Sequence, residues 1–204
     1  MVIKMMNGGV NVKKILLVSL FCLLSVAAFS QIGTDIFGGF GWGIGLTHTG
    51  TAVYHTEPAS DSKLNLIDVG LLVDYEIANG FKIGGGVGGA FPMASGTAFS
   101  LADKDGNEKK IGFMVDGLVG VSYSYPLEPV VLKANIIGGI SFLDMTHMGF
   151  LVKAKFGLGY AINNFVISVG AGYEMRNYNI VVGEDKGSLN ITSIPIELGI
   201  SVKF

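Results

Sequence analysis

The last twelve residues of the chain alternate between apolar and polar or small side chains without a break. Ile194, Ile196, Leu198, Ile200, Val202 and Phe204 alternate with Ser193, Pro195, Glu197, Gly199, Ser201 and Lys203. A period of two is typical of a β-strand with one apolar face. Half of the residues in the chain are hydrophobic, yet after residue 30 no apolar run approaches the roughly 20 residues that a transmembrane helix needs. This combination favours β-structure over helices.

The same alternation recurs in seven earlier segments, and glycines occupy many of the positions between the apolar ones. The eight predicted strands lie near 36–47, 68–77, 81–91, 113–125, 132–142, 152–162, 165–176 and 193–204. In the first of them Phe40, Trp42, Ile44 and Leu46 share the apolar face. Short turns are predicted near residues 79, 127 and 163, and long polar loops at 48–63, 92–110, 143–150 and 177–189. Short turns and long loops therefore alternate along the chain.

An even number of strands, with long loops at one end only, is the architecture of a bacterial outer-membrane barrel. The sequence thus predicts an all-β protein, an eight-stranded antiparallel up-and-down transmembrane β-barrel with both termini in the periplasm. A soluble eight-stranded barrel of the lipocalin type is the alternative, but it would place the apolar face inside. A continuous apolar face on every strand would promote aggregation in water unless lipid covered it.

The first thirty residues have the features of a secretion signal. Lys13 and Lys14 precede the apolar run that starts at Ile15, and Ala28 and Ser30 are small residues at the positions a signal peptidase requires. We therefore expect a signal peptide at 1–30 and a single barrel domain at 31–204. Cys22 is the only cysteine and lies within the predicted signal, behind Phe21, so neither lipid anchoring nor a cysteine-based site is expected.

The polar face of the predicted strands carries equal numbers of acids and bases. The acids are Asp68, Asp74, Glu76, Asp116, Glu174 and Glu197, and the bases are Lys82, Lys133, Lys153, Lys155, Arg176 and Lys203. Charges removed from water need partners, so these residues are expected to form an ion-pair network. An eight-stranded barrel is just wide enough for side chains to fill. The network should therefore plug the lumen and leave no open pore.

The chain resembles the small outer-membrane β-barrel superfamily, of the OmpX type and the type of the OmpA membrane domain, and more closely the PorT-like barrel domains. Three features carry the resemblance: the signal ending Ala28-Phe29-Ser30, the eight alternating strands, and the terminal Ser201-Val202-Lys203-Phe204. The resemblance implies that Ile200, Val202 and Phe204 form the C-terminal signal read by the barrel-assembly machinery. It also implies outer-membrane lipid and lipopolysaccharide as partners.

Because fold does not fix function, several functions remain open. We expect a structural or surface-interaction barrel with an unidentified extracellular ligand at its loops. A narrow channel for small solutes and a lipid A-modifying enzyme are the alternatives. The enzyme alternative rests on His48 and His147, which lack a convincing nucleophile nearby in the sequence, so we predict that the protein is not an enzyme.

No cofactor, metal or nucleic-acid site is expected. Gly84 to Gly89 matches G-x-G-x-x-G, but no helical pattern follows to hold a phosphate. Asp103, Asp105 and Glu108 form only a fragment of a calcium loop. Loss of Lys4, Lys13 and Lys14 with the signal leaves 14 − 3 = 11 basic residues against 16 acidic ones, which disfavours nucleic acid.

Overall fold

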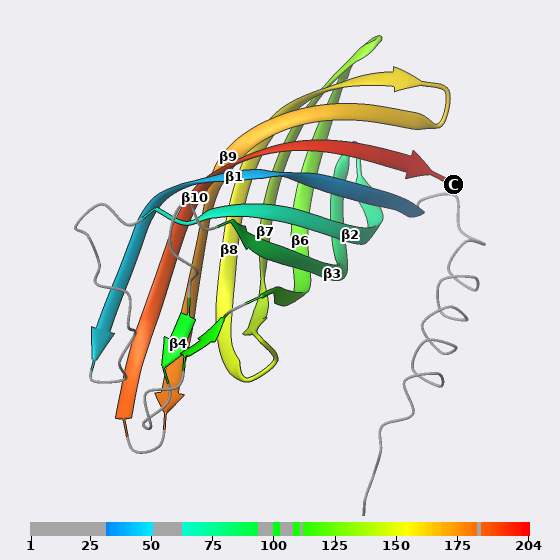
Figure 1. The fold of residues 1–204 in the computed structure, drawn as a ribbon. Coiled ribbons are helices and arrows are strands. Elements are labelled where there is room, and N and C mark those ends of the chain that lie inside the picture. The colour runs from blue at the N-terminus through cyan, green and yellow to red at the C-terminus, as the bar shows by residue number, and fades with distance from the viewer. Residues whose placement is uncertain (1–31, 51–62, 94–99, 103–107, 111, 183–184) are drawn as a thin grey trace, which may run out of the picture.

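The computed structural model describes residues 32–50, 63–93, 100–102, 108–110, 112–182 and 185–204, and these residues form ten β-strands (Figure 1). The strands are β1 (Ile32–Gly50), β2 (Asn65–Ala78), β3 (Phe81–Met93), β4 (Ser100–Ala102), β5 (Glu108–Lys110), β6 (Met114–Leu127), β7 (Val130–Leu143), β8 (His147–Ile162), β9 (Phe165–Val182) and β10 (Asp185–Lys203). The predicted signal peptide lies outside the described residues. Within them, no helix has the length and hydropathy of a membrane span.

Eight of the strands form one closed antiparallel barrel in the order β1-β10-β9-β8-β7-β6-β3-β2. Closure comes from β1, which pairs with β2 on one side and with the C-terminal strand β10 on the other, for example Ile36 with Ile200. Strands β4 and β5 form a separate two-stranded sheet. The predicted all-β, eight-stranded up-and-down barrel is confirmed.

The barrel has two distinct ends. At the end we call the turn end, short turns follow β2, β6 and β8, and the first described residue, Ile32, lies beside the C-terminal Phe204, whose amide donates to the Ile32 carbonyl (Figure 1). Asn79 and Gly80 both have positive φ at the first turn, as a two-residue hairpin turn requires. The opposite end, called the loop end, holds the other four connections. This arrangement matches the predicted position of the short turns.

Two of the four predicted long loops are wrong. Strand β8 starts after only three residues beyond β7, Asp144 to Thr146, where Asp144 and Met145 both have positive φ. Strands β9 and β10 continue through most of the predicted loop at 177–189. The other two predicted loops agree better with the structure. Strand β1 ends at Gly50, within the predicted loop at 48–63, and the predicted loop at 92–110 contains the small β4–β5 sheet.

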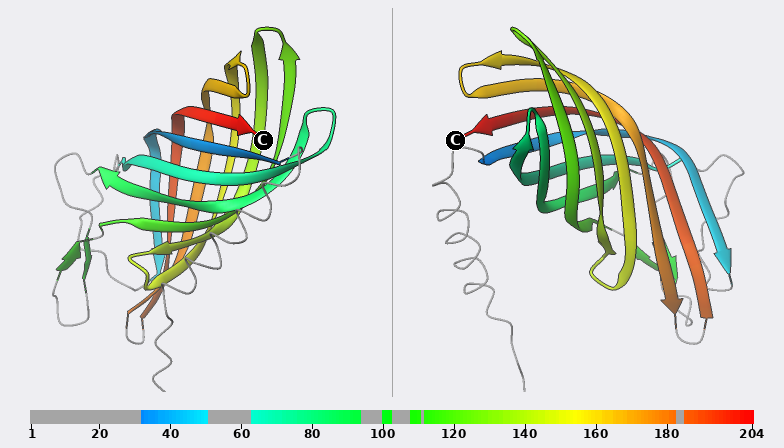
Figure 2. Two further views of the ribbon diagram at one scale, coloured as in Figure 1. Left: turned by 90° about the vertical axis from the view of Figure 1, so that its right-hand side faces the viewer. Right: turned by 180° about the vertical axis from the view of Figure 1, so that it is seen from behind.

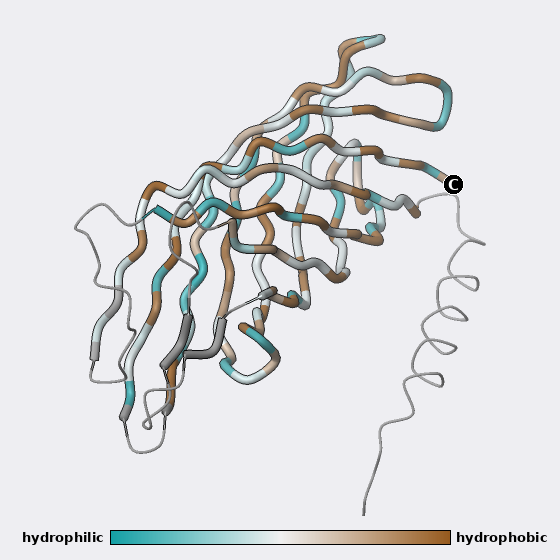
Figure 3. The backbone as a smooth tube through the Cα atoms, viewed as in Figure 1, coloured by the Kyte–Doolittle hydropathy of each residue, from teal (hydrophilic) through white to brown (hydrophobic). Residues whose placement is uncertain are grey.

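The outward face of the barrel is predominantly apolar along the central part of every strand. Brown and pale segments alternate along the tube in Figure 3, as the period of two demands. Phe156 is 74% exposed, and Leu198 and Val119 are exposed to a similar degree. The exposed apolar residues include Ile36, Trp42, Ile67, Val87, Phe91, Ile136, Ile140, Leu158, Val169, Ile194 and Ile196. Because a lipocalin would bury these side chains, the soluble-barrel alternative is excluded.

Near the loop end the pattern reverses, and apolar side chains point into the barrel. A register shift between Gly43 and Gly45 turns Leu46 toward the interior, so its predicted outward placement is wrong. Leu46 packs there against a buried apolar cluster that closes the loop end of the barrel, and we call this cluster the apolar seal. Its residues are Leu64, Leu66, Ala90, Met114, Leu143, Tyr178, Ile180, Leu189 and Ile191.

Strands β9, β10 and β1 project beyond the rest of the wall at the loop end (Figure 2). Pairing of β1 with β2 ends at Gly41, and pairing of β8 with β9 ends at Tyr178. Beyond these points the three strands pair only with one another among the described residues, as far as Gly50 on β1. This three-stranded extension turns its inner side chains toward the apolar seal.

Candidate functional site

Arg176 is the centre of a buried ion-pair network that joins three other positions across the lumen. Its Nε donates to Glu174 Oε1 at 2.6 Å, its Nη1 to Asp116 Oδ1 at 2.8 Å, and its Nη2 to Asp68 Oδ1 at 3.1 Å. The side chain is 1% exposed. A planar guanidinium with five donors suits this role, because it can satisfy several carboxylates at fixed angles.

Lys153 and Lys155 continue the network on β8. The ammonium of Lys153 lies 2.5 Å from Glu174 Oε2 and 2.8 Å from Glu197 Oε1. Lys155 pairs with the other oxygen of Glu197. Each of these charges is buried, so pairing offsets the desolvation cost that an isolated charge would carry. The central network thus ties β2, β6, β8, β9 and β10 together.

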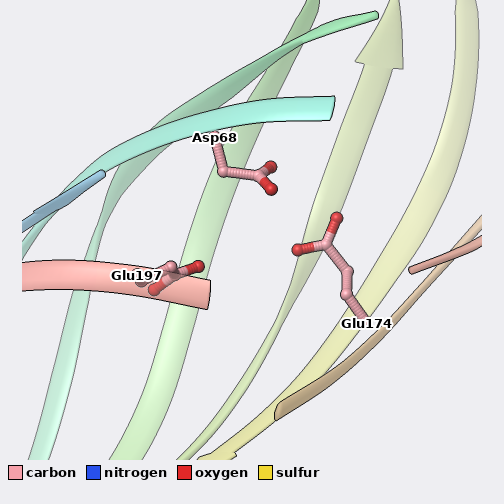
Figure 4. Close-up of side chains that lie close together, drawn as sticks. All are labelled: Asp68, Glu174 and Glu197. Atoms are coloured by element: carbon pink, nitrogen blue, oxygen red, sulfur yellow. The ribbon is translucent and has the colours of Figure 1, made fainter. Parts of the chain in front are cut away.

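Three carboxylates of the network, those of Asp68, Glu174 and Glu197, converge from β2, β9 and β10 (Figure 4). One oxygen of each lies within 4.8 Å of the others, which is a spacing that could hold a metal ion. The ammonium of Lys153 already sits among them, at 4.0 Å from Asp68 Oδ1 in addition to its two shorter contacts. A lysine therefore supplies the positive charge that a metal would otherwise bring.

An aromatic ring separates the central network from the charges nearer the turn end. Phe37 points inward, with Lys155 Nζ 4.2 Å and Lys153 Nζ 5.7 Å from its ring centroid, so both contacts are of the cation–π kind. The ring fits only because Gly70 faces it: a Cβ on Gly70 would lie 2.3 Å from the Phe37 ring. Leu118, Ile137 and Leu151 form a buried apolar cluster, and Phe37 packs against it.

Three further ion pairs lie toward the turn end. Lys82 pairs with Asp74 at 3.1 Å, and Lys133 pairs with Asp35 at 3.3 Å while donating to Ser201 Oγ at 2.5 Å. Lys203 pairs with Glu76 at 2.8 Å, but this pair sits at the mouth of the barrel, where the Lys203 side chain is 57% exposed. A cavity of about 510 Å³ opens there, lined partly by Lys82, Lys133 and Lys203.

All twelve charged residues predicted for the lumen are therefore in ion pairs inside the barrel or at its mouth. Four polar partners of these charges were not predicted from the sequence: Asp35, Ser141, Tyr178 and Ser201. Ser141 Oγ donates to Asp116 Oδ1 at 2.6 Å and lies 2.7 Å from the Tyr178 hydroxyl. Asp35 is a seventh acid beside the six predicted, so the equal balance of predicted charges is wrong by one. Asp35 lies an even number of residues before Gly39 and Gly41, so the alternation of the first strand could have placed it on the inward face.

The interior above the mouth is closed. Three cavities along the lumen measure about 40 Å³ beside Phe37 and about 10 Å³ each beside Leu118 and Asn135. Spaces of the smaller size hold about one water molecule each. Three layers follow one another along the lumen: the apolar seal, the ion-pair network around Arg176 and Lys153, and the Phe37 ring with its apolar neighbours. The described residues therefore enclose no continuous passage.

The other predicted sites are placed as follows. Gly84 to Gly89 lie in strand β3 and precede no helix in the described part of the chain. Asp103 and Asp105 lie outside the described residues, as do the side chains of His48 and Glu108. Ile200 and Phe204 are exposed on the outward face with Val202, so the three residues of the predicted assembly signal share one face.

Comparisons with known proteins support the fold. No family model and no curated protein matches the chain. The crystal structure of Neisserial surface protein A (NspA) is similar, with a TM-score of 0.53 and 13% identity over 86% of this chain and 98% of that one. The β domain of the Bordetella autotransporter BrkA has a TM-score of 0.30 and 8% identity, over 84% of this chain and 99% of that one. The P. putida toluene transporter TodX has a TM-score of 0.25 and 10% identity, over 87% of this chain and 67% of that one.

A closed eight-stranded wall with an apolar outer face and a charged, filled interior defines the class of membrane-spanning β-barrels. Within that class, the similarity to NspA shows the fold of a small outer-membrane barrel. The finer resemblance to OmpX-like and PorT-like barrels stays a prediction.

Proposed function

We propose that this protein is a closed structural barrel of the bacterial outer membrane that anchors its loop-end segments at the cell surface. Its turn end would face the periplasm, because short turns lie on the periplasmic side of such barrels. Both described ends, Ile32 and Phe204, would then be periplasmic. The displayed surface would comprise the extension of β9, β10 and β1 and the β4–β5 sheet, where an extracellular ligand would bind.

The observation that carries this proposal is the filled lumen. Arg176 and Lys153 link carboxylates from several strands at the level of the central network, and the apolar seal covers that network at the loop end. A channel would need a polar path through both layers. The narrow-channel alternative has no feature of the described lumen in its favour.

Conductance measurements test the closed barrel. The folded protein in planar bilayers should give no stable current steps above the baseline of protein-free membranes, whereas a porin measured in the same set-up serves as the positive control. Reproducible steps that scale with protein concentration would overturn the proposal and favour the channel.

Cysteine labelling in intact cells tests the orientation. In a Cys22→Ala background, Lys186→Cys at the loop end should react with a membrane-impermeant maleimide in whole cells. Asn164→Cys at the turn end should react only after the outer membrane is permeabilised. The reverse pattern would place the loop end in the periplasm.

The proposal extends to the assembly of the barrel and to its lack of enzymatic activity. Phe204, Val202 and Ile200 are proposed to be read by the barrel-assembly machinery, so deleting Phe204 should reduce the heat-modifiable folded form in cell envelopes. The protein is also proposed to lack lipid A-modifying activity. Lipid A from cells that overproduce the protein should keep its mass, and a shift by an acyl chain would contradict this.

A further inference from the structure

From the base of the three-stranded extension upward, the outward face of β1, β10 and β9 carries a regular array of neutral polar side chains. In one row Thr47 pairs with Asn190, which pairs with Asn177, and in the next row Thr49 pairs with Ser188, which pairs with Asn179. Cross-strand partners share a face of the sheet. The six residues, Thr47, Thr49, Asn177, Asn179, Ser188 and Asn190, are called the polar array.

Side-chain hydrogen bonds hold the polar array in place. Thr49 Oγ1 lies 2.7 Å from Ser188 Oγ, and Asn177 Nδ2 donates to Asn190 Oδ1. One row lower, Thr192 Oγ1 donates to the Gly45 carbonyl at 3.2 Å. Amides and hydroxyls retain further donors and acceptors after such single bonds. The array therefore presents fixed groups with free hydrogen-bonding capacity.

The inner face of the same segment is apolar and buried. Tyr178, Ile180, Leu189 and Ile191 alternate with array residues along β9 and β10 and are buried in the apolar seal. Adjacent strands lie about 4.8 Å apart and alternate residues about 7 Å apart along a strand, so the array spans roughly 10 by 7 Å. An area of that size has room for a small saccharide unit.

Neither folding propensity nor solubility accounts for this composition. Asparagine is depleted in strands, yet three of the six array positions hold it. A solvent-exposed sheet face usually carries charges of both signs. The array has none, and Lys186 at the tip is the charged neighbour on that face among the described residues.

The array continues directly from the lipid-facing surface. Trp42 and Ile194, paired on β1 and β10 just below it, are exposed on the same outward face. Under the proposed orientation the array would lie where the headgroups of the outer leaflet begin. Uncharged amides and hydroxyls match the hydroxyls of a sugar better than they match a phosphate, which attracts Arg and Lys.

We propose that the polar array is a contact surface for the neutral saccharide of an outer-leaflet glycolipid. The inference rests on the proposed outer-membrane location with the loop end outside. The sugar hydroxyls would exchange hydrogen bonds with Asn177, Asn190 and Thr47, while the acyl chains of the same lipid lie against Trp42 and Ile194.

Lipid retention tests the proposal. The folded full-length barrel is reconstituted with lipopolysaccharide that carries its core sugars, or with a form truncated close to lipid A, and bound lipid is quantified by native mass spectrometry. The wild type should retain the full-core form over the truncated one. Asn177→Leu with Asn190→Leu should reduce retention of the full-core form roughly five- to tenfold and leave the truncated form unchanged. Asn164→Ala, at the turn end, serves as the control and should change neither.

Equal retention of both lipids by the wild type, or no effect of the double variant, would overturn the inference. If the double variant fails to show heat-modifiable migration, Thr47→Val removes one hydroxyl with little change in shape and decides the question by the same readout. The labelling of Lys186→Cys separates the two proposals: accessible labelling without sugar dependence leaves the location intact and removes only the saccharide contact.

Discussion

Arg176 on β9 donates through Nη2 to Asp68 Oδ1 on β2 at 3.1 Å, which links two strands that are not neighbours in the wall. The same guanidinium contacts Asp116 and Glu174. Barrel stability should therefore depend strongly on this one side chain.

Replacing Arg176 by Met should leave the buried Asp116 without its ion-pair partner and leave Asp68 and Glu174 with Lys153 as their remaining cation. We expect a loss of about 3–5 kcal/mol in the free energy of unfolding. Urea unfolding in phospholipid vesicles, followed by the fluorescence of Trp42, the only tryptophan, measures it. Adding Glu174→Gln to Arg176→Met should recover part of the loss. A single variant as stable as the wild type would show that the network does not hold the barrel together.

The contact between Phe37 and Gly70 predicts a size-dependent effect. Gly70→Ala would place a Cβ 2.3 Å from the Phe37 ring, so we expect a loss of about 1–3 kcal/mol. Gly117 faces open space, and Gly117→Ala should change stability by less than about 0.5 kcal/mol. In a Phe37→Leu background the cost of Gly70→Ala should fall. If the two costs simply added, the proposed clash would be wrong.

The lipid-facing belt predicts a dependence on depth. Val119, near the middle of β6, is 65% exposed, and Val119→Arg should cost about 2–4 kcal/mol in vesicles. Leu127, at the turn end of the same strand, is also exposed, and Leu127→Arg should cost about 0–1 kcal/mol. Unfolding in vesicles of each variant gives the comparison. Equal costs at both positions would argue against a membrane-embedded belt.

The apolar seal predicts that inward positions matter more than outward ones near the loop end. Leu66 is fully buried, so Leu66→Ala should cost about 2–5 kcal/mol. Its neighbour Ile67 is 40% exposed on the outward face, and Ile67→Ala should cost less because lipid can fill the space. Thermal or urea unfolding compares the pair. A larger loss for Ile67 would contradict the inward packing of the seal.

The alternation by itself determined the number of barrel strands, the face of each central segment and the position of the twelve predicted charges inside the barrel or at its mouth. This was possible because strand parity is local: each residue points opposite to its neighbour, whatever the rest of the chain does. Ile196 and Glu197 on β10 show the two outcomes, one exposed and one buried.

Only the tertiary structure decided which charge meets which. The pairing of Arg176 with Asp68 depends on the stagger with which eight strands close, and that stagger is set by the whole ring. The bulge at Gly43 to Gly45 likewise reverses parity and turns Leu46 inward. On β9 and β10 at the same end of the barrel the outward positions are polar, as at Asn177 and Asn190, which is why residues 177–182 and 185–189 looked like a loop although they belong to strands.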